Sequence, residues 1–268
     1  MDRQNAAIMQ AEQSRQFQTD DSYIIVKAAP RASKANGETV CIAGLNSDGS
    51  WVRLYPVSFK DLKEGQRFGR WDQVRYRWRR PTGISDLRDE SRRVDSQSIE
   101  IVGTMPLKER HSFLRRVAVT SLQRERELGK SLALLRPEVD AFFYKRKSTD
   151  DLSQEQGVRD ELRAQSDMFT RDVVIPKEIC SFAFFYSYRD DDGHHTGTCQ
   201  DWETEATFLR RRREMGESAA LNWMQEMFGE RYVERGMALA MGTHRYRHDQ
   251  WLINGIIRID DSSQLTLL

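Results

Sequence analysis

The stretch Trp71-Asp72-Gln73-Val74-Arg75-Tyr76-Arg77-Trp78-Arg79 alternates strictly between apolar and basic side chains from its fourth residue onward. A period of two residues is typical of a β-strand with one buried face and one solvated face. We therefore predict a strand over residues 71–79. Its apolar residues should face a core, and its basic residues should face solvent: Val74, Tyr76 and Trp78 on the first face, and Arg75, Arg77 and Arg79 on the second.

Short β-like runs lie on both sides of this strand. They cover residues 23–28, 39–45, 51–55 and 98–102, and Asp48-Gly49 supplies a hairpin turn between two of them. Several short strands with turn signals are typical of a small barrel. The sequence predicts an antiparallel, OB-like or SH3-like β-barrel domain over residues 22–105, with a long polar loop over residues 79–96.

Helical and mixed patterns follow the predicted barrel. Apolar residues recur at helical spacing over residues 108–128, 202–214 and 217–228, whereas residues 180–188 alternate. The last apolar runs, residues 237–242 and 251–259, indicate a hairpin. Strands followed by helices and then by both kinds of element favour an α+β fold, with a helical and mixed α/β domain over residues 106–268.

Composition and cysteine content limit the classes of protein to which the chain can belong. The chain has 268 residues, 38% of them apolar, and a formal net charge of +1. Its three cysteines, Cys41, Cys180 and Cys199, have no CxxC spacing, which argues against a disulfide framework and indicates a reducing, cytoplasmic location. The N-terminus has no signal-peptide pattern, and no apolar run is long enough to span a membrane, so no membrane partner is expected.

A local basic, aromatic region suggests nucleic acid as the partner. Residues 51–93 carry twelve Lys or Arg and six Asp or Glu, a local net charge of +6, together with seven aromatic residues. Proteins that bind single strands use cations along the phosphates and aromatic rings against the bases. We expect binding of single-stranded or structured DNA or RNA through the following residues: Trp51, Arg53, Tyr55, Arg75, Arg77, Arg79, Arg88, His244 and Arg245. The alternative is a solvated strand face with no ligand.

A second hypothesis comes from three polar residues in the C-terminal half. His195, Asp201 and Glu203 could act as a general acid–base set or as ligands of a divalent metal, which would be the cofactor of a metal-dependent hydrolase or nuclease. The structural alternative is that Asp201 caps a helix beginning near residue 202, with Glu203 in its first turn. Both interpretations remain open at this point.

Other enzyme classes are disfavoured, because the chain lacks a GxxxxGK[ST] loop, a GxGxxG turn, a GxSxG elbow and an HExxH helix. A non-catalytic scaffold or sensor in a defence system is the third hypothesis. The sequence does not predict an oligomeric state.

Several phrases occur in a consistent order along the chain. They are the GETVCIAG run at residues 37–44, the WVRLYP run at residues 51–56, Asp86, Arg88, Glu90 and Ser91, Ser131-Leu132 with Pro137, His195 with Asp201-Trp202-Glu203, and Gly242-Thr243-His244 before Trp251. In these phrases the chain resembles an uncharacterised family of bacterial proteins of similar length. The resemblance implies that residues 86–93 and 195–203 are sites, without implying an activity. The family pattern has a cysteine three residues before His195; Asp192 stands there, which departs from a cysteine-containing zinc site.

Overall fold

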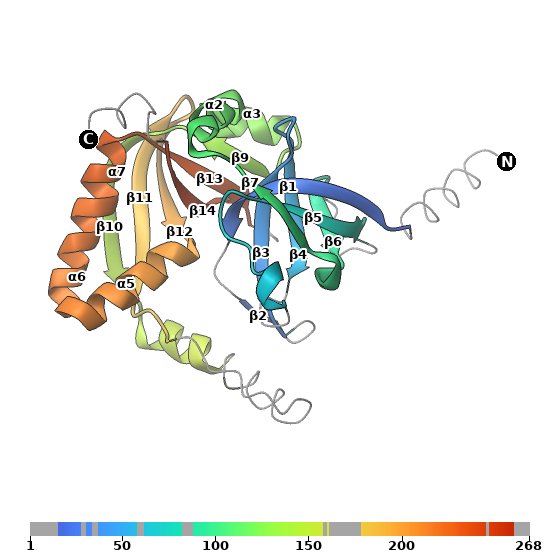
Figure 1. Ribbon diagram of the computed structural model, residues 1–268. Helices are drawn as coiled ribbons and strands as arrows, with labels where there is room; N and C mark the ends of the chain where they lie inside the picture. The colour runs from blue at the N-terminus through green and yellow to red at the C-terminus, as the bar shows by residue number, and fades with distance from the viewer. Residues whose placement is uncertain are drawn as a thin grey trace.

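The computed structural model describes residues 16–27, 31–33, 37–57, 62–81, 88–157, 160, 178–244 and 247–259 (Figure 1). These residues form two β-sheets and the helices that accompany the second sheet, so the fold is α+β as predicted. Among them, no helix is long and apolar enough to cross a membrane.

The first sheet closes into a five-stranded ring. Its strands are β1 (Gln18–Lys27), β3 (Gly37–Leu45), β4 (Trp51–Val57), β5 (Asp72–Arg79) and β6 (Ser91–Val94). The ring order is β1-β3-β4-β6-β5, and β5 pairs back with β1. Counted along the chain, this is first, second, third, fifth, fourth, with the third and fifth strands parallel, which is the order of an OB-type barrel. Two further strands pair at the edges: β2 (Arg31–Ser33) with β3, and β7 (Glu100–Thr104) with β5.

The alternation that predicted β5 also predicted its faces correctly. Tyr76 is fully buried and Trp78 is 5% exposed, whereas Arg75 and Arg77 are exposed. Tyr76 contacts Ser22 through its hydroxyl (2.8 Å), and Trp78 donates from Nε1 to Asp20 Oδ2 (2.8 Å). Because the hydroxyl of Tyr76 and the indole N–H of Trp78 each have a partner, the barrel interior accommodates these two large rings without leaving either group unpaired.

One strand of the ring differs from the prediction. Residues 98–102 were expected to close the barrel, but β7 lies outside the ring, and β6 completes it from within the segment predicted to be a loop. β6 has only four residues, of which Ser91 and Val94 are buried. It is held by parallel pairing with β4 and antiparallel pairing with β5. So short and polar a run has no hydrophobic period from which a strand could be predicted. Backbone pairing with distant strands stabilises it instead.

The second sheet has the order β10-β11-β12-β14-β13-β9-β8. Its strands are β8 (Ala118–Val119), β9 (Leu132–Leu135), β10 (Glu138–Arg146), β11 (Phe182–Asp190), β12 (Gly193–Cys199), β13 (Met237–Thr243) and β14 (Trp251–Arg258). The C-terminal hairpin was predicted correctly, but β10 and β9 were not recognised as strands. The region predicted as one helix over residues 108–128 forms two, α2 (Leu107–Val117) and α3 (Leu122–Glu127), separated by β8.

The two faces of the second sheet belong to two different hydrophobic cores. One face is covered by α5 (Trp202–Met215), α6 (Glu217–Met224), the π-helical stretch η4 (Gln225–Arg231) and α7 (Tyr232–Glu234) (Figure 1). The opposite face of β9, β13 and β14 packs against the barrel. This junction core draws on both sheets; its members include Ile25, Leu45 and Trp71 from the barrel and Leu134, Ala240 and Ile257 from the second sheet.

Candidate functional site at the junction of the two sheets

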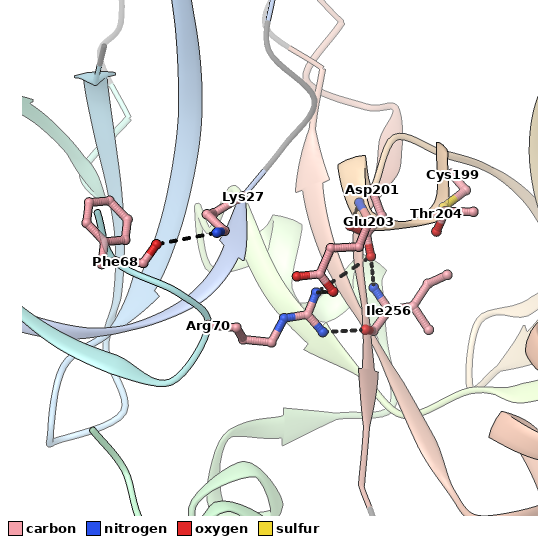
Figure 2. A network of polar contacts seen from close by, with 8 residues as sticks. All are labelled: Lys27, Phe68, Arg70, Cys199, Asp201, Glu203, Thr204 and Ile256. Atoms are coloured by element: carbon pink, nitrogen blue, oxygen red, sulfur yellow. Dashed lines mark hydrogen bonds and ion pairs between the residues drawn. The ribbon is translucent and has the colours of Figure 1, made fainter. Parts of the chain in front are cut away.

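Asp201 lies where α5, the second sheet and the barrel meet (Figure 2). Its Oδ1 accepts from the backbone N–H of Glu203 (3.0 Å), which makes it the N-cap of α5, as the structural interpretation predicted. Its Oδ2 accepts from the backbone N–H of Ile256 on β14 (2.9 Å). Both carboxylate oxygens therefore hold α5 against β14.

Arg70 connects this carboxylate to the barrel. Its guanidinium donates from Nη1 to the Ile256 carbonyl (2.8 Å) and lies 3.0 Å from Glu203 Oε2 and 3.7 Å from Asp201 Oδ2 (Figure 2). Arg70 precedes β5, so these contacts join segments 131 or more residues apart along the chain, counted from residue 70 to residue 201. No local pattern in the sequence could have indicated this pairing.

Burial shifts the ionisation of the groups around Arg70. Removal from water raises the pKa of Asp201 from its ordinary value of 3.8 to about 6, and the charge of Arg70 opposes part of that rise. Burial also lowers the pKa of Lys27, which donates to the Phe68 carbonyl (3.4 Å), while Glu203 opposes the shift. At the junction, Asp201 therefore takes up a proton at mildly acidic pH.

A small pocket opens beside this network, with a volume of about 200 Å³. Its walls come from the barrel side, from α2, from α5, from η4 and α7, and from β14; they include Arg70, Trp71, Arg110, Glu203, Tyr232 and Arg258. Arginine side chains and the rings of Trp71, Phe228 and Tyr232 give it a mixed polar and apolar lining. Glu203, with a half-exposed side chain, faces this space while it pairs with Arg70.

The structure does not bring His195 together with Asp201 and Glu203. His195 lies on β12 near the β11–β12 turn, where its Nε2 is 2.8 Å from Asp190 Oδ1 and its ring packs on Tyr188. Asp201 follows the opposite end of β12. Within the described ranges, no three His, Cys, Asp or Glu side chains are close enough together to hold a metal ion. The predicted trio is thus a pair at the junction plus a separate histidine–aspartate contact.

A second polar cluster at the junction contains residues that were predicted to bind nucleic acid. Arg53 is 6% exposed and donates from Nη2 to the Ser131 hydroxyl (3.1 Å) and carbonyl (3.3 Å). Ser131 in turn donates from its N–H and hydroxyl to the buried carboxylate of Glu90 (2.8 and 3.1 Å). Arg88 donates to the carbonyl of Thr243 at the end of β13 (3.5 Å). These contacts tie the barrel to the second sheet.

The other predicted nucleic-acid residues occupy different surroundings. The half-buried Trp51 packs against the junction core, and His244 Nδ1 accepts from the backbone N–H of Arg247 (3.2 Å). Arg245 lies outside the described residues, as does Asp86 from the family phrases. The arginines of β5 and Tyr55 are the predicted residues that reach the outer barrel surface.

The outer surface of β5 extends into a row that the sequence did not reveal. Arg79 pairs directly with the exposed Arg93 on β6, and Arg93 pairs with Tyr55 on β4. Directly opposed residues share one face of a sheet, so these three side chains lie side by side. Phe17, which is 45% exposed, lies beneath the guanidinium groups of Arg77 (4.8 Å) and Arg79 (5.7 Å). We call Phe17, Tyr55, Arg77, Arg79 and Arg93 the barrel row. Arg93 and Phe17 were missed because only strand register places them beside Arg79.

Comparison with family models matches residues 18–120 to a domain of unknown function (DUF8758) and residues 116–267 to a second one (DUF8757). The first match covers the barrel, and the second covers the second sheet with its helices. No curated protein matches the chain. Because the second match extends over more than half of the 268 residues, the chain belongs to the family described as domain of unknown function (DUF8757), and it carries the DUF8758 domain before it.

Proposed function

We propose that this protein binds single-stranded nucleic acid along the outer surface of its barrel. The observation that carries the proposal is the barrel row: guanidinium groups from β5 and β6 lie between two aromatic side chains, Tyr55 and Phe17. Guanidinium groups attract phosphates, and exposed aromatic rings stack on bases of any sequence. Few other ligands match both kinds of group along one continuous line.

Positive charge is distributed unevenly over this surface, and its excess lies at the end of β5 that leads to β6. Arg75 lies near the carboxylate of Asp21 (4.0 Å) and is paired across the strands with the exposed Glu100. Arg77, Arg79 and Arg93 lie farther along β5 and β6, toward the β5–β6 connection. An anionic chain would therefore be attracted most strongly to the barrel row, while Arg75 contributes less.

The position of the row also follows from what covers the rest of the barrel. OB-type barrels commonly bind oligonucleotides across their second and third strands. In this protein these strands are β3 and β4, and their outward residues Leu45, Trp51 and Arg53 pack against the second sheet. β5 and β6 lie on the side of the barrel away from that sheet (Figure 1). Among the described strands of the barrel, β5 and β6 therefore offer an outer surface to a long ligand.

The test is binding of a fluorescently labelled 15-nucleotide single strand, followed by fluorescence anisotropy at several salt concentrations. Three engaged phosphates should give a slope of log affinity against log salt of about −2, at about −0.7 per phosphate. The triple variant Arg77→Ala, Arg79→Ala and Arg93→Ala should flatten this slope and weaken binding at low salt. Its melting temperature should change little, because Arg77 and Arg93 are exposed and Arg79 is only partly buried, and such residues contribute little to stability.

A matched control removes exposed arginines elsewhere. The double variant Arg124→Ala and Arg126→Ala, on α3, should leave the slope as it is. No binding by the unaltered protein at low salt, or equal loss in both variants, would refute the barrel row as the nucleic-acid surface.

A further inference from the structure

The second sheet carries a stacked aromatic pair on the face opposite its helices. Phe143 on β10 and Phe185 on β11 are directly opposed across the strands, with ring centroids 5.2 Å apart and planes 13° from parallel. Phe142 and Phe184, their neighbours in sequence, point the other way into the core beneath α5 and η4. Both rings of the pair stay partly accessible to solvent.

Strand register surrounds this pair with polar side chains and two small alanines, Ala141 on β10 and Ala183 on β11. Lys145 holds its ammonium 5.4 Å from the Phe185 centroid and 5.9 Å from that of Phe143. Phe185 is opposed on β12 by Thr198, and the next pair along is Ser187 with the exposed Thr196. One row further, Arg189 is opposed by His194, whose Nε2 contacts the Ser187 hydroxyl (3.0 Å).

These residues form one surface, which we call the sheet platform: Phe143, Lys145, Phe185, Ser187, Arg189, His194, Thr196 and Thr198. Three adjacent strands span roughly 10 Å between the outer two. That width suits a single extended strand of nucleic acid. The two rings are stacked on each other, so each keeps one aromatic face that the other ring does not cover and on which a base can stack. The hydroxyl groups can exchange hydrogen bonds with base edges, and Lys145 supplies a cation beside the rings.

We propose that the sheet platform is a second contact surface for single-stranded nucleic acid, where bases stack on Phe143 and Phe185. The inference rests on the proposed function and extends it, because it assigns base contacts to a surface separate from the barrel row. Some sheets that bind single-stranded RNA likewise stack bases on aromatic side chains of their strands.

A protein partner fits this surface less well. Stable protein interfaces bury about 800 Å² on each partner around an apolar centre. Two phenylalanines and two alanines, bordered by threonine, serine, lysine and arginine, are too small an apolar area to supply such a centre. Arg189 is also ion-paired with Asp140 (2.7 Å), so the net positive charge of the platform is small. Stacking on the rings, rather than attraction of phosphates, should then dominate its affinity.

Affinity for a labelled 15-nucleotide oligothymidine and oligouridine tests the inference. The double variant Phe143→Leu and Phe185→Leu keeps apolar side chains and removes the aromatic faces; it should bind at least about tenfold more weakly, with an unchanged salt slope. The barrel-row triple variant should show the opposite pattern, a flatter slope. A 5-iodouracil-substituted strand, irradiated in the complex, should cross-link to the peptides that contain Phe143 or Phe185.

Each outcome separates the two surfaces. Weakened binding and cross-links at residues 143 or 185 support the platform, even if the arginine variant is unaffected and the barrel row fails. Unchanged affinity of the leucine variant, with cross-links confined to Phe17 or Tyr55, overturns the platform and leaves the barrel row standing. Absence of any binding by the unaltered protein overturns both. A melting temperature within a few degrees of the unaltered protein establishes that the leucine variant is folded.

Discussion

Glu90 illustrates how a charged residue in a polar segment can serve the interior of a protein. It is 6% exposed, and its two carboxylate oxygens accept from the N–H and the hydroxyl of Ser131, 41 residues later. The same glutamate presents its carbonyl to the backbone N–H of Arg53 (2.8 Å). Its carboxylate therefore accepts hydrogen bonds from buried donors at the junction rather than facing a ligand.

Replacing Glu90 by alanine should lower stability rather than nucleic-acid affinity. The change leaves two buried donors of Ser131 without acceptors, and each such loss costs about 1–3 kcal/mol. We expect the free energy of unfolding in urea to fall by about 2–4 kcal/mol. Glu234→Ala, at an exposed position on α7, should change it by less than about 0.5 kcal/mol. Equal effects of the two changes would mean that Glu90 is not a structural tie.

Asp201 should make stability depend on pH in the mildly acidic range. Its pKa is raised from 3.8 to about 6, so between these values the folded protein retains a proton that the unfolded chain has lost. The stability that this proton contributes is complete below pH 3.8 and is lost as pH rises through 6. The expected loss is on the order of 3 kcal/mol, at about 1.4 kcal/mol for each unit of pKa.

Comparison with Asp201→Asn isolates this effect from other titrating groups. An amide cannot accept from both Glu203 and Ile256, so the variant should be less stable at every pH. The difference between the two proteins in free energy of unfolding should shrink between pH 4.5 and 7, measured by urea titration. A difference that is constant over this range would show that Asp201 is not protonated in the folded state.

At the scale of elements, the sequence predicts those whose side chains alternate between water and core. β5 was predicted with its correct faces because Val74, Tyr76 and Trp78 enter a core and the arginines between them do not. β9 was not recognised, since all four of its residues are buried, between the helices on one side and the barrel on the other. A short run that is apolar throughout has no period that separates strand from helix.

In the candidate site, the sequence predicted only the roles that local structure determines. Asp201 precedes a helix, so its capping role could be inferred from the sequence, but its contacts with Arg70 and Ile256 could not. Arg53 was expected on a surface because charged residues are seldom buried, and its burial follows from Ser131, 78 residues away. Pairing between such distant residues is decided by the tertiary fold, which no local pattern encodes.

At the scale of the whole molecule, the junction core makes the two sheets dependent on each other. Gly255 on β14 faces Val26 on β1 so closely that an added methyl group would lie 2.9 Å from a Val26 methyl carbon. The backbones of the two sheets can approach this closely only because residue 255 has no side chain.

Gly255→Ala should therefore destabilise both sheets together. Overpacking of a core costs about 1–3 kcal/mol, and tryptophan fluorescence and far-ultraviolet circular dichroism should still report one coincident transition at a lower urea midpoint. Gly65→Ala is the control, because an added methyl group there meets no atom within 4 Å. Two separate transitions in the Gly255 variant would mean that the barrel and the second sheet unfold independently.

The order in which the chain is synthesised has a consequence for the junction core. The barrel is complete at Val94, but the strands that cover Leu45 and Trp71 include β13, which begins at Met237, 143 residues later. At roughly 5–20 residues per second on the ribosome, about 7–30 s separate these two events. During that interval the nascent barrel displays an uncovered apolar surface, so incomplete chains that end between Val94 and Met237 should associate with chaperones that bind such surfaces. Release from the chaperone should coincide with synthesis of the C-terminal hairpin.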